Sequence, residues 1–188
     1  MRRTWAVVAV CSLLGVGALR ADAPVMDAVA VAPEGDRLVV SGRLEDGLSP
    51  DMLEEIGAGL ETGVVYRVNV YRVRPGLPNE AIAKRRIECV VRYDALTRQY
   101  TLTRKVDGDT VDSRVTTEAP AMKQFLTTLD GVGVLPIAGL STGQEYYAKV
   151  KAELGIVWRF YLIPWPLDTA WVRVPIHLSE GAAREAEP

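Results

Sequence analysis

Apolar and polar residues alternate along most of this chain, a two-residue period typical of β-strands with one buried and one solvated face. In 64–74, for example, one side carries Val64, Tyr66, Val68 and Val70, whereas Arg67 and Asn69 lie on the other. The same period predicts strands at 28–32, 37–44, 64–74, 85–93, 99–106, 110–117, 144–154 and 170–178. Hairpin turns are expected at 33–36 and at Asp107-Gly108-Asp109, because an Asp-Gly pair supplies the positive φ that a tight turn needs.

Two segments follow a helical period instead. Ser49-Pro50-Asp51 provides a capping hydroxyl and an N-terminal proline, and an apolar stripe through Met52, Leu53, Ile56 and Leu60 follows, with Gly63 as the expected end. The second helix is expected over 119–130, with Met122, Phe125, Leu126 and Leu129 facing inward. Many short strands with two brief helices predict an antiparallel two-layer β-sandwich with two short helical insertions. The alternative is an α+β domain with a helix packed on one antiparallel sheet.

The N-terminus has the layout of a secretory signal peptide. Arg2 and Arg3 precede an uncharged apolar run at 5–19, and Ala21 and Ala23 offer the small residues that a signal peptidase needs. We therefore expect a signal peptide at 1–23 and an exported, periplasmic or extracellular protein. An uncleaved N-terminal anchor is the alternative. The sequence predicts one β-rich domain over 24–178 and a disordered tail at 179–188.

Charge and cysteine content limit the partners and the disulfides that the chain can have. The chain has 22 basic and 24 acidic residues and a net charge of −2, which argues against a nucleic-acid partner. Only Cys89 remains once a signal peptide has left, so an intrachain disulfide is excluded in that form. Cys89 lies on the apolar side of its strand, and we expect it to be buried.

The residues that usually carry chemistry are sparse. His177 is the single histidine, on the polar side of the last strand, so a surface role is expected rather than general-base catalysis. One histidine and one cysteine do not make a zinc site. Asp107, Asp109 and Asp112 offer oxygen ligands for calcium, but a plain hairpin turn explains them equally well. We predict no catalytic residue, no metal and no cofactor.

Two groups of residues are candidate partner contacts. Trp165 lies between two prolines, which favour an edge or a loop and would leave the indole available to a partner. The basic residues Lys84, Arg85 and Arg86 face Arg72 and Arg74 across a predicted turn. If the two strands pair, these cations are expected to gather at one end of the sheet and receive an anionic partner. The alternative is a solvated strand end.

Several short motifs resemble a known family. A helix at 49–60 and strands at 64–74 and 85–93 lead into the segment Tyr93-Asp94-Ala95-Leu96-Thr97-Arg98-Gln99-Tyr100-Thr101-Leu102. Tyr146-Tyr147, Pro164-Trp165-Pro166-Leu167 and Trp171 follow in the same order. This arrangement is similar to an uncharacterised family of exported bacterial proteins, the domain of unknown function DUF4390. The resemblance implies a secreted single domain and carries over no activity or site residue.

Three function classes remain open. We favour a noncatalytic interaction or scaffold domain of the bacterial cell envelope, whose partner is an unknown envelope protein, because sandwich surfaces bind without specialised chemistry. The second is a small-ligand binding protein with an inter-sheet cavity. The third is a hydrolase that uses two convergent carboxylates. Membrane contact is expected only through an uncleaved signal.

Overall fold

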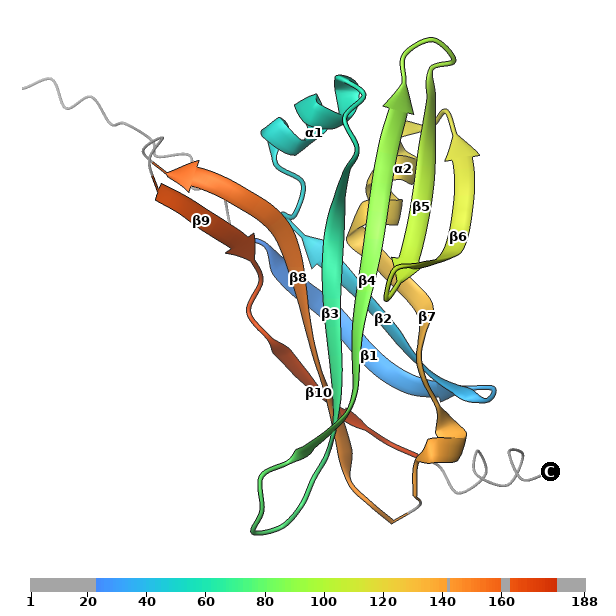
Figure 1. The fold of residues 1–188 in the computed structure, drawn as a ribbon, viewed down its shortest axis with the longest axis vertical. Helices are drawn as coiled ribbons and strands as arrows, with labels where there is room; N and C mark the ends of the chain where they lie inside the picture. Colours follow the sequence, from blue (N-terminus) through green and yellow to red (C-terminus); the bar gives the residue numbers. More distant parts are fainter. Residues whose placement is uncertain (1–22, 142, 160–162, 179–188) are drawn as a thin grey trace, which may run out of the picture.

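The strands, in which buried and exposed residues alternate, form two antiparallel sheets (Figure 1). The computed structural model describes residues 23–141, 143–159 and 163–178. The predicted signal peptide and tail thus fall outside the described residues, apart from Ala23. The strands are β1 (Val25–Glu34), β2 (Arg37–Glu45), β3 (Thr62–Arg72), β4 (Glu80–Asp94), β5 (Gln99–Val106), β6 (Asp109–Thr116), β7 (Thr128–Pro136), β8 (Tyr146–Arg159), β9 (Ile163–Asp168) and β10 (Val172–Ile176). The helices are α1 (Pro50–Gly57) and α2 (Ala119–Thr127), with a short 3₁₀ turn, η1, at Ile137–Gly139.

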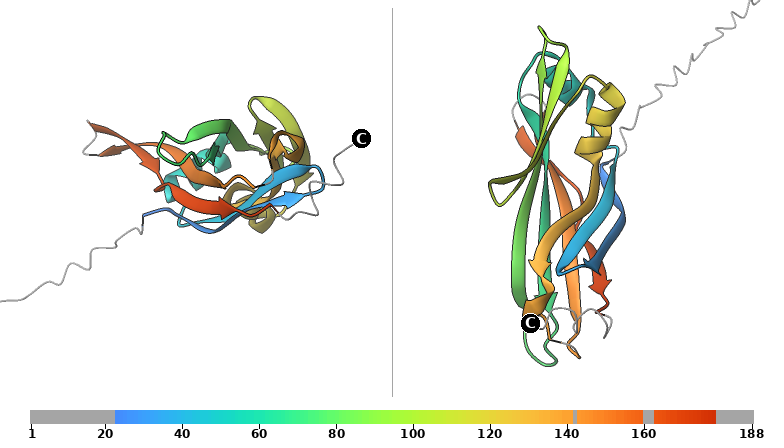
Figure 2. Two further views of the ribbon diagram at one scale, coloured as in Figure 1. Left: turned by 90° about the horizontal axis from the view of Figure 1, so that it is seen from below. Right: turned by 90° about the vertical axis from the view of Figure 1, so that its right-hand side faces the viewer.

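The two sheets form two layers. The large sheet has the order β10-β8-β3-β4-β5-β6, with β9 also paired to β8, and the small sheet has the order β1-β2-β7. Figure 2 shows the small sheet and α2 side by side in one layer against the large sheet. The predicted two-layer β-sandwich with two short helical insertions is confirmed. The helix-on-sheet packing of the alternative occurs locally, where α2 contacts β4, β5 and β6.

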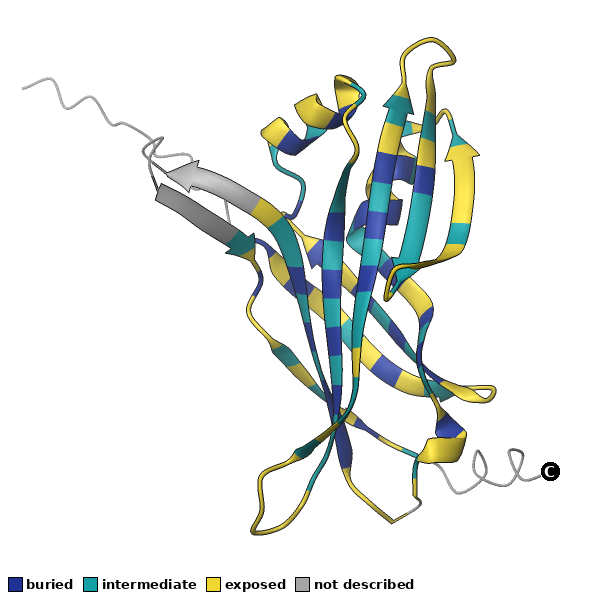
Figure 3. Cartoon of the chain, in the orientation of Figure 1, coloured by how far each residue is buried: buried dark blue, intermediate teal, exposed yellow. Residues whose placement is uncertain are grey.

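One continuous apolar core lies between these layers. Figure 3 shows the alternating buried bands on β3 and β4, which come from Val64, Tyr66, Val68 and Val70 and from Ile87, Cys89 and Val91. Small-sheet and helix residues join the same cluster. Tyr66 is fully buried, and its hydroxyl donates a 2.6 Å hydrogen bond to the Leu126 carbonyl of α2. Burial of Cys89 is confirmed, with none of it exposed.

Both helices are shorter than the sequence predicted. The first ends at Gly57 rather than near Leu60, because Gly59 takes a left-handed φ of 82° just after it. Leu60 consequently lies off the apolar stripe and is 57% exposed. Gly63 does not end the helix but belongs to β3, where a Cβ would lie only 2.3 Å from the Cys89 carbonyl oxygen. A bare backbone is therefore required there.

The second helix ends at Thr127, and the predicted extension to residue 130 is wrong. Strand β7 begins directly at Thr128, which is already extended at φ −126° and ψ 125°. Leu129, Val132 and Val134 of this strand are all buried, and an irregularity in the pairing with β2 separates Leu129 from Val132. Leu129 continues the apolar stripe of the helix although it lies in β7, and this explains the misplaced boundary.

Strand β7 pairs with β2 irregularly. Leu38 lies opposite Leu135 and Val39 opposite Gly133, so the ladder leaves Val134 without a partner. Such a bulge places an extra backbone group outside the regular pairing. Arg85 of β4 satisfies the carbonyl of Val134 from the opposite sheet, through a 2.7 Å hydrogen bond from its Nε.

A cationic face on the large sheet as the candidate functional site

The outer face of the large sheet carries the polar half of the strand alternation. Arg67 of β3 lies directly opposite Lys151 of β8 on one side and Arg86 of β4 on the other. In the next row, Asn69 lies between Lys149 and Lys84, and Arg173 of β10 is opposite Lys149. We call this surface the cationic face, formed by Arg67, Lys84, Arg86, Lys149, Lys151 and Arg173.

A row of carboxylates borders half of these cations. Glu153 accepts from Arg67 Nε at 3.1 Å and lies 3.0 Å from Lys151 Nζ, whereas Arg86 Nε donates to Glu88 at 2.7 Å. In the described part of the chain, Lys84, Lys149 and Arg173 have no carboxylate within ion-pair distance. The face therefore keeps positive charge that its own acids do not neutralise.

The ion pairs around Lys151 shift the acid–base equilibria of both partners. Lys151 Nζ also bonds Asp168 at 2.9 Å, and this hydrogen bond, followed by those to Glu153, raises the pKa of Lys151. Partial burial acts to raise the pKa of Glu153, but hydrogen bonds and charges from Lys151 and Arg67 outweigh it and lower that pKa. Lys151 and Glu153 are therefore both charged at neutral pH.

Aromatic rings lie among the cations. Tyr71 and Tyr147 stack with centroids 5.1 Å apart and planes 13° from parallel. The Arg173 guanidinium lies 3.8 Å from the Tyr147 centroid, and Lys151 Nζ lies 5.3 Å from the ring of Trp171, which is 43% exposed. Part of the face forms a shallow depression of about 440 Å³. Cation–π contacts hold the basic side chains close to the sheet.

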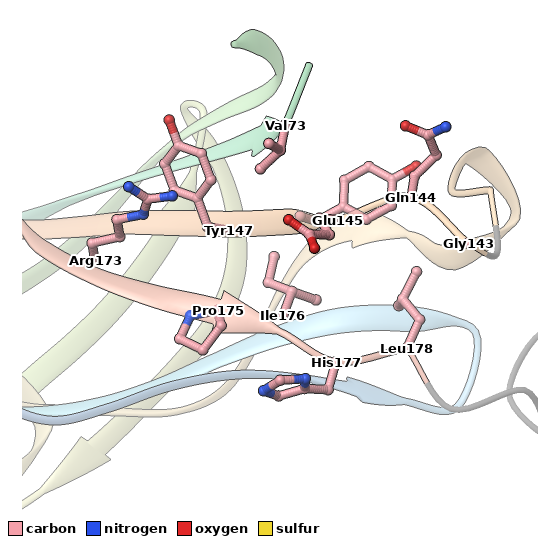
Figure 4. A pocket seen from close by; sticks show the side chains of 11 residues that line it. Val73, Gly143, Gln144, Glu145, Tyr147, Arg173, Pro175, Ile176, His177 and Leu178 are labelled. Atoms are coloured by element: carbon pink, nitrogen blue, oxygen red, sulfur yellow. The ribbon is translucent and has the colours of Figure 1, made fainter. Parts of the chain in front are cut away.

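A second hollow lies at the end of the large sheet where β8 begins and β10 ends. Its volume is about 670 Å³. Figure 4 shows Arg173 against Tyr147 at one side of this end cavity, with His177 at the other and Glu145 between them. His177 is exposed, as expected, and follows the last residue of β10. The cavity shares Arg173 and Tyr147 with the cationic face.

The predicted basic cluster is divided by the structure. The two strands pair as expected, but the register puts Arg72 opposite Glu80, whereas Lys84 is opposite Asn69, farther along the hairpin. The Glu80 carboxylate binds Arg72 and lies 3.7 Å from Arg74 Nη1. The gathering of all five cations at one end of the sheet is therefore not found. Of the predicted residues, Lys84 and Arg86 belong to the cationic face.

Arg85 points to the opposite side from its two neighbours, because side chains alternate along a strand. Besides its bond to Val134, it donates from Nη1 to the Asp107 carboxylate at 2.7 Å. Asp107 also accepts from the backbone N–H of Arg86 at 2.9 Å. Burial acts to raise the pKa of Asp107, but these bonds and the charge of Arg85 outweigh it and lower the pKa. Both carboxylate oxygens are thereby occupied in the predicted hairpin turn.

The remaining predicted contact is Trp165. Its backbone lies in β9, opposite Val157 of β8, and β9 is an edge strand as the prolines indicated. Its side chain lies outside the described part of the structure. Across the described residues, no three His, Cys, Asp or Glu side chains gather as a metal site.

Sequence reasoning missed Arg67, Lys149 and Lys151 as parts of one surface. Their alternation placed each on a polar face, but β3 and β8 are far apart in the chain. Arg67 and Glu153, which join these strands, are separated by 86 residues. Only the sheet order shows that the two polar faces are continuous.

Fold and face together define the molecule as a two-layer antiparallel β-sandwich with a cationic outer surface. Residues 21–157 match the family described as a domain of unknown function (DUF4390), and the chain belongs to that family. No curated protein and no solved structure matches the chain. The matched segment contains Arg67, Lys84, Arg86, Lys149 and Lys151, whereas Trp171, Arg173 and His177 lie beyond it. No helix of the described residues has the length and apolar character needed to cross a membrane.

Proposed function

We propose that this protein is a noncatalytic interaction domain of the bacterial cell envelope that binds an acidic protein partner through the cationic face. The observation that carries the proposal is the row in which Arg173 lies directly opposite Lys149, with Lys84 beyond Asn69. In the described part of the chain, none of these three cations has a carboxylate within ion-pair distance. Like charges in opposed positions destabilise a sheet. Core packing gains nothing from this arrangement, whereas a partner with complementary charge stabilises it.

Two features favour a protein over a uniform polyanion. The acidic row at Glu88, Glu153 and Asp168 would repel a nucleic-acid backbone or an anionic lipid layer, and the whole chain has a net charge of −2. A protein surface can present basic groups to this row and acidic groups to the cations. The face also presents the half-buried Tyr71 and the exposed Trp171 and Arg173, and these are residue types that protein interfaces favour.

The acids on this face give little support to the carboxylate-based hydrolase. Glu153 and Asp168 both bind Lys151 Nζ, and the pKa of Glu153 is lowered. A general acid needs a carboxyl whose pKa is raised toward neutrality. These two carboxylates are better suited to holding Lys151 in place.

The location outside the cytoplasm rests on the sequence at 1–23. If that segment is a cleaved signal peptide, the exported form begins between Leu19 and Pro24. Intact-mass measurement on protein recovered from the envelope tests this, and a species that retains residues 1–18 would establish an anchored protein instead.

The partner interaction is tested by photo-crosslinking in the native cell. A photoreactive phenylalanine analogue at Asn69, in the middle of the cationic face, is expected to form an adduct with an acidic envelope protein. The same analogue at Arg43, exposed on the small sheet, is the matched control. The combined variant Lys84→Glu and Lys149→Glu should abolish the adduct while the domain unfolds at an unchanged temperature. No adduct at Asn69, or one that survives both charge reversals, would overturn the proposal.

The end cavity favours the binding of a small ligand as a second candidate function. Its volume of about 670 Å³ lies within the usual range for ligand sites, and Arg173 beside Tyr147 suits an aromatic carboxylate. This cavity is at the end of the sheet rather than between the sheets, where the sequence placed it. Calorimetry with benzoate as the probe is expected to show binding that Arg173→Ala removes, and no heat at millimolar benzoate counts against it.

A further inference from the structure

Strand β6 is an uncovered edge of the large sheet. It pairs with β5 on one side, and no strand in the described ranges pairs with its other side. Six of its eight residues are exposed, including Val111 at 56% and Val115 at 57%, and it is yellow almost throughout in Figure 3. A free edge offers a row of backbone N–H and C=O groups for pairing with another chain.

The other edges of the sandwich are protected, and this distinguishes β6 from them. Pro33 lies in β1, Pro136 at the end of β7 and Pro175 in β10, and proline cannot donate a backbone hydrogen bond to an incoming strand. Strand β1 also has an irregular register around Ala28, whose φ is 49°. The sequence of β6 contains no proline and no lysine.

The sequence of β6 is complementary to itself. A two-fold axis through Ser113 would place Asp112 opposite Arg114 of a second copy, and by symmetry Arg114 opposite Asp112. In the described part of the chain, neither residue has an ion-pair partner of its own. The exposed Val111 and Val115 lie at the two ends of this paired segment. Opposite charges in facing positions each stabilise an antiparallel pair by about 0.2–1 kcal/mol.

Only this register places Asp112 and Arg114 each opposite a charge of the other sign. An axis through Asp112 or Arg114 sets that residue against its own copy, and like charges in facing positions destabilise the pair. An axis between residues sets an inner-face side chain against an outer-face one, because a strand alternates with a period of two. We therefore propose that two copies of this chain associate through their β6 edges, so that the two large sheets become one continuous antiparallel sheet with its axis at Ser113.

Charge reversal tests the register. Sedimentation velocity on the full chain is expected to show a dimer that dissociates on dilution, since one strand edge buries little area. Either single reversal, Arg114→Asp or Asp112→Arg, should lower dimer affinity, and combining the two should restore it. Arg43→Asp on β2, a strand paired on both sides, is the control that should leave the dimer unchanged. A monomer at every concentration, or a dimer that survives both single reversals, would overturn the proposal.

A cysteine cross-link gives a readout that does not depend on charge. Facing residues of an antiparallel pair have Cα atoms about 4.5–5.5 Å apart, within the range that a disulfide spans. Ser113→Cys, in a Cys11→Ser background, should therefore form a covalent dimer under mild oxidation; the native Cys89 is buried. Val115→Cys is the matched control on the same strand, because the two copies of residue 115 would lie about 13 Å apart. Equal cross-linking of both variants, or of neither, would refute the register.

Discussion

Arg85 is expected to stabilise the fold, whereas its neighbour Lys84 contributes to the surface. Arg85→Met keeps the apolar stem but removes the 2.7 Å bonds to the Val134 carbonyl and the Asp107 carboxylate. A hydrogen bond from a charged donor stabilises a protein by about 1.5–3 kcal/mol, and the partly buried site favours the lower end of that range. The ion pair with Asp107 is about one-third exposed on both sides and adds at most about 1 kcal/mol.

We therefore expect Arg85→Met to lower the free energy of unfolding by about 2 kcal/mol. Urea unfolding followed by tryptophan fluorescence measures this as a midpoint lowered by about 1 M, since slopes for small domains are about 1–3 kcal/mol per molar. Lys84→Met is the matched control and should change stability by no more than about 0.5 kcal/mol. If the two variants unfold at the same urea concentration, the assignment of opposite faces to these residues is wrong.

Three further predictions concern the core and the charges. Gly63→Ala should destabilise the domain by about 1–3 kcal/mol in the same assay, because the new Cβ would lie 2.3 Å from the Cys89 carbonyl oxygen. Gly133→Ala, whose Cβ would lie 3.6 Å from the nearest atom, is the control expected to be mild. Cys89 should react with a native-state thiol reagent only after denaturation, and rapid labelling without denaturant would contradict its burial. The pKa values of Asp107 and Glu153 are lowered below their ordinary 3.8 and 4.5. The two ionised carboxylates therefore stabilise the fold fully at a pH above 3.8 and 4.5, and this stabilisation is lost as the pH falls through the lowered pKa values. Acid titration of the unfolding temperature should show this loss, and replacing Asp107 by asparagine should reduce it.

Local patterns predicted most strands but missed β7 and β9, and they did not predict which residues lie opposite one another. Strand β5 has the predicted bounds, 99–106, because its alternation is regular and turns flank it on both sides. The α2–β7 boundary was misplaced because Leu129 continues the helical stripe although it lies in the strand. The predicted arrangement of the basic cluster was wrong, because the register of the two strands determines which residues lie opposite one another. Arg72 lies opposite Glu80 because of the length of the loop that joins β3 and β4, which the alternation of apolar and polar residues does not predict.

The candidate site was harder to predict than the fold. Lys84 and Arg86 stood out as a run of charges, whereas Arg67, Lys149 and Lys151 look like ordinary solvated positions. Sheet order brings these residues into adjacent rows, and a two-residue period carries no information about which distant strands pair. The bulge at Val134, and with it the inward role of Arg85, likewise depends on packing between the two layers.

The pairing of β3 with β8 also determines when the cationic face is complete. Strands β3 to β6 form successive hairpins, which close quickly, but β8 must return over an interval of 86 residues to reach β3. Arg67 and Arg86 belong to the early part of the sheet, whereas Lys149 and Lys151 arrive with the late strand. A chain shortened before residue 146 would carry half of the cations but neither complete row. The cationic rows are therefore assembled only in a molecule that has finished folding, so under the proposed function a partly folded chain would offer the partner no complete row.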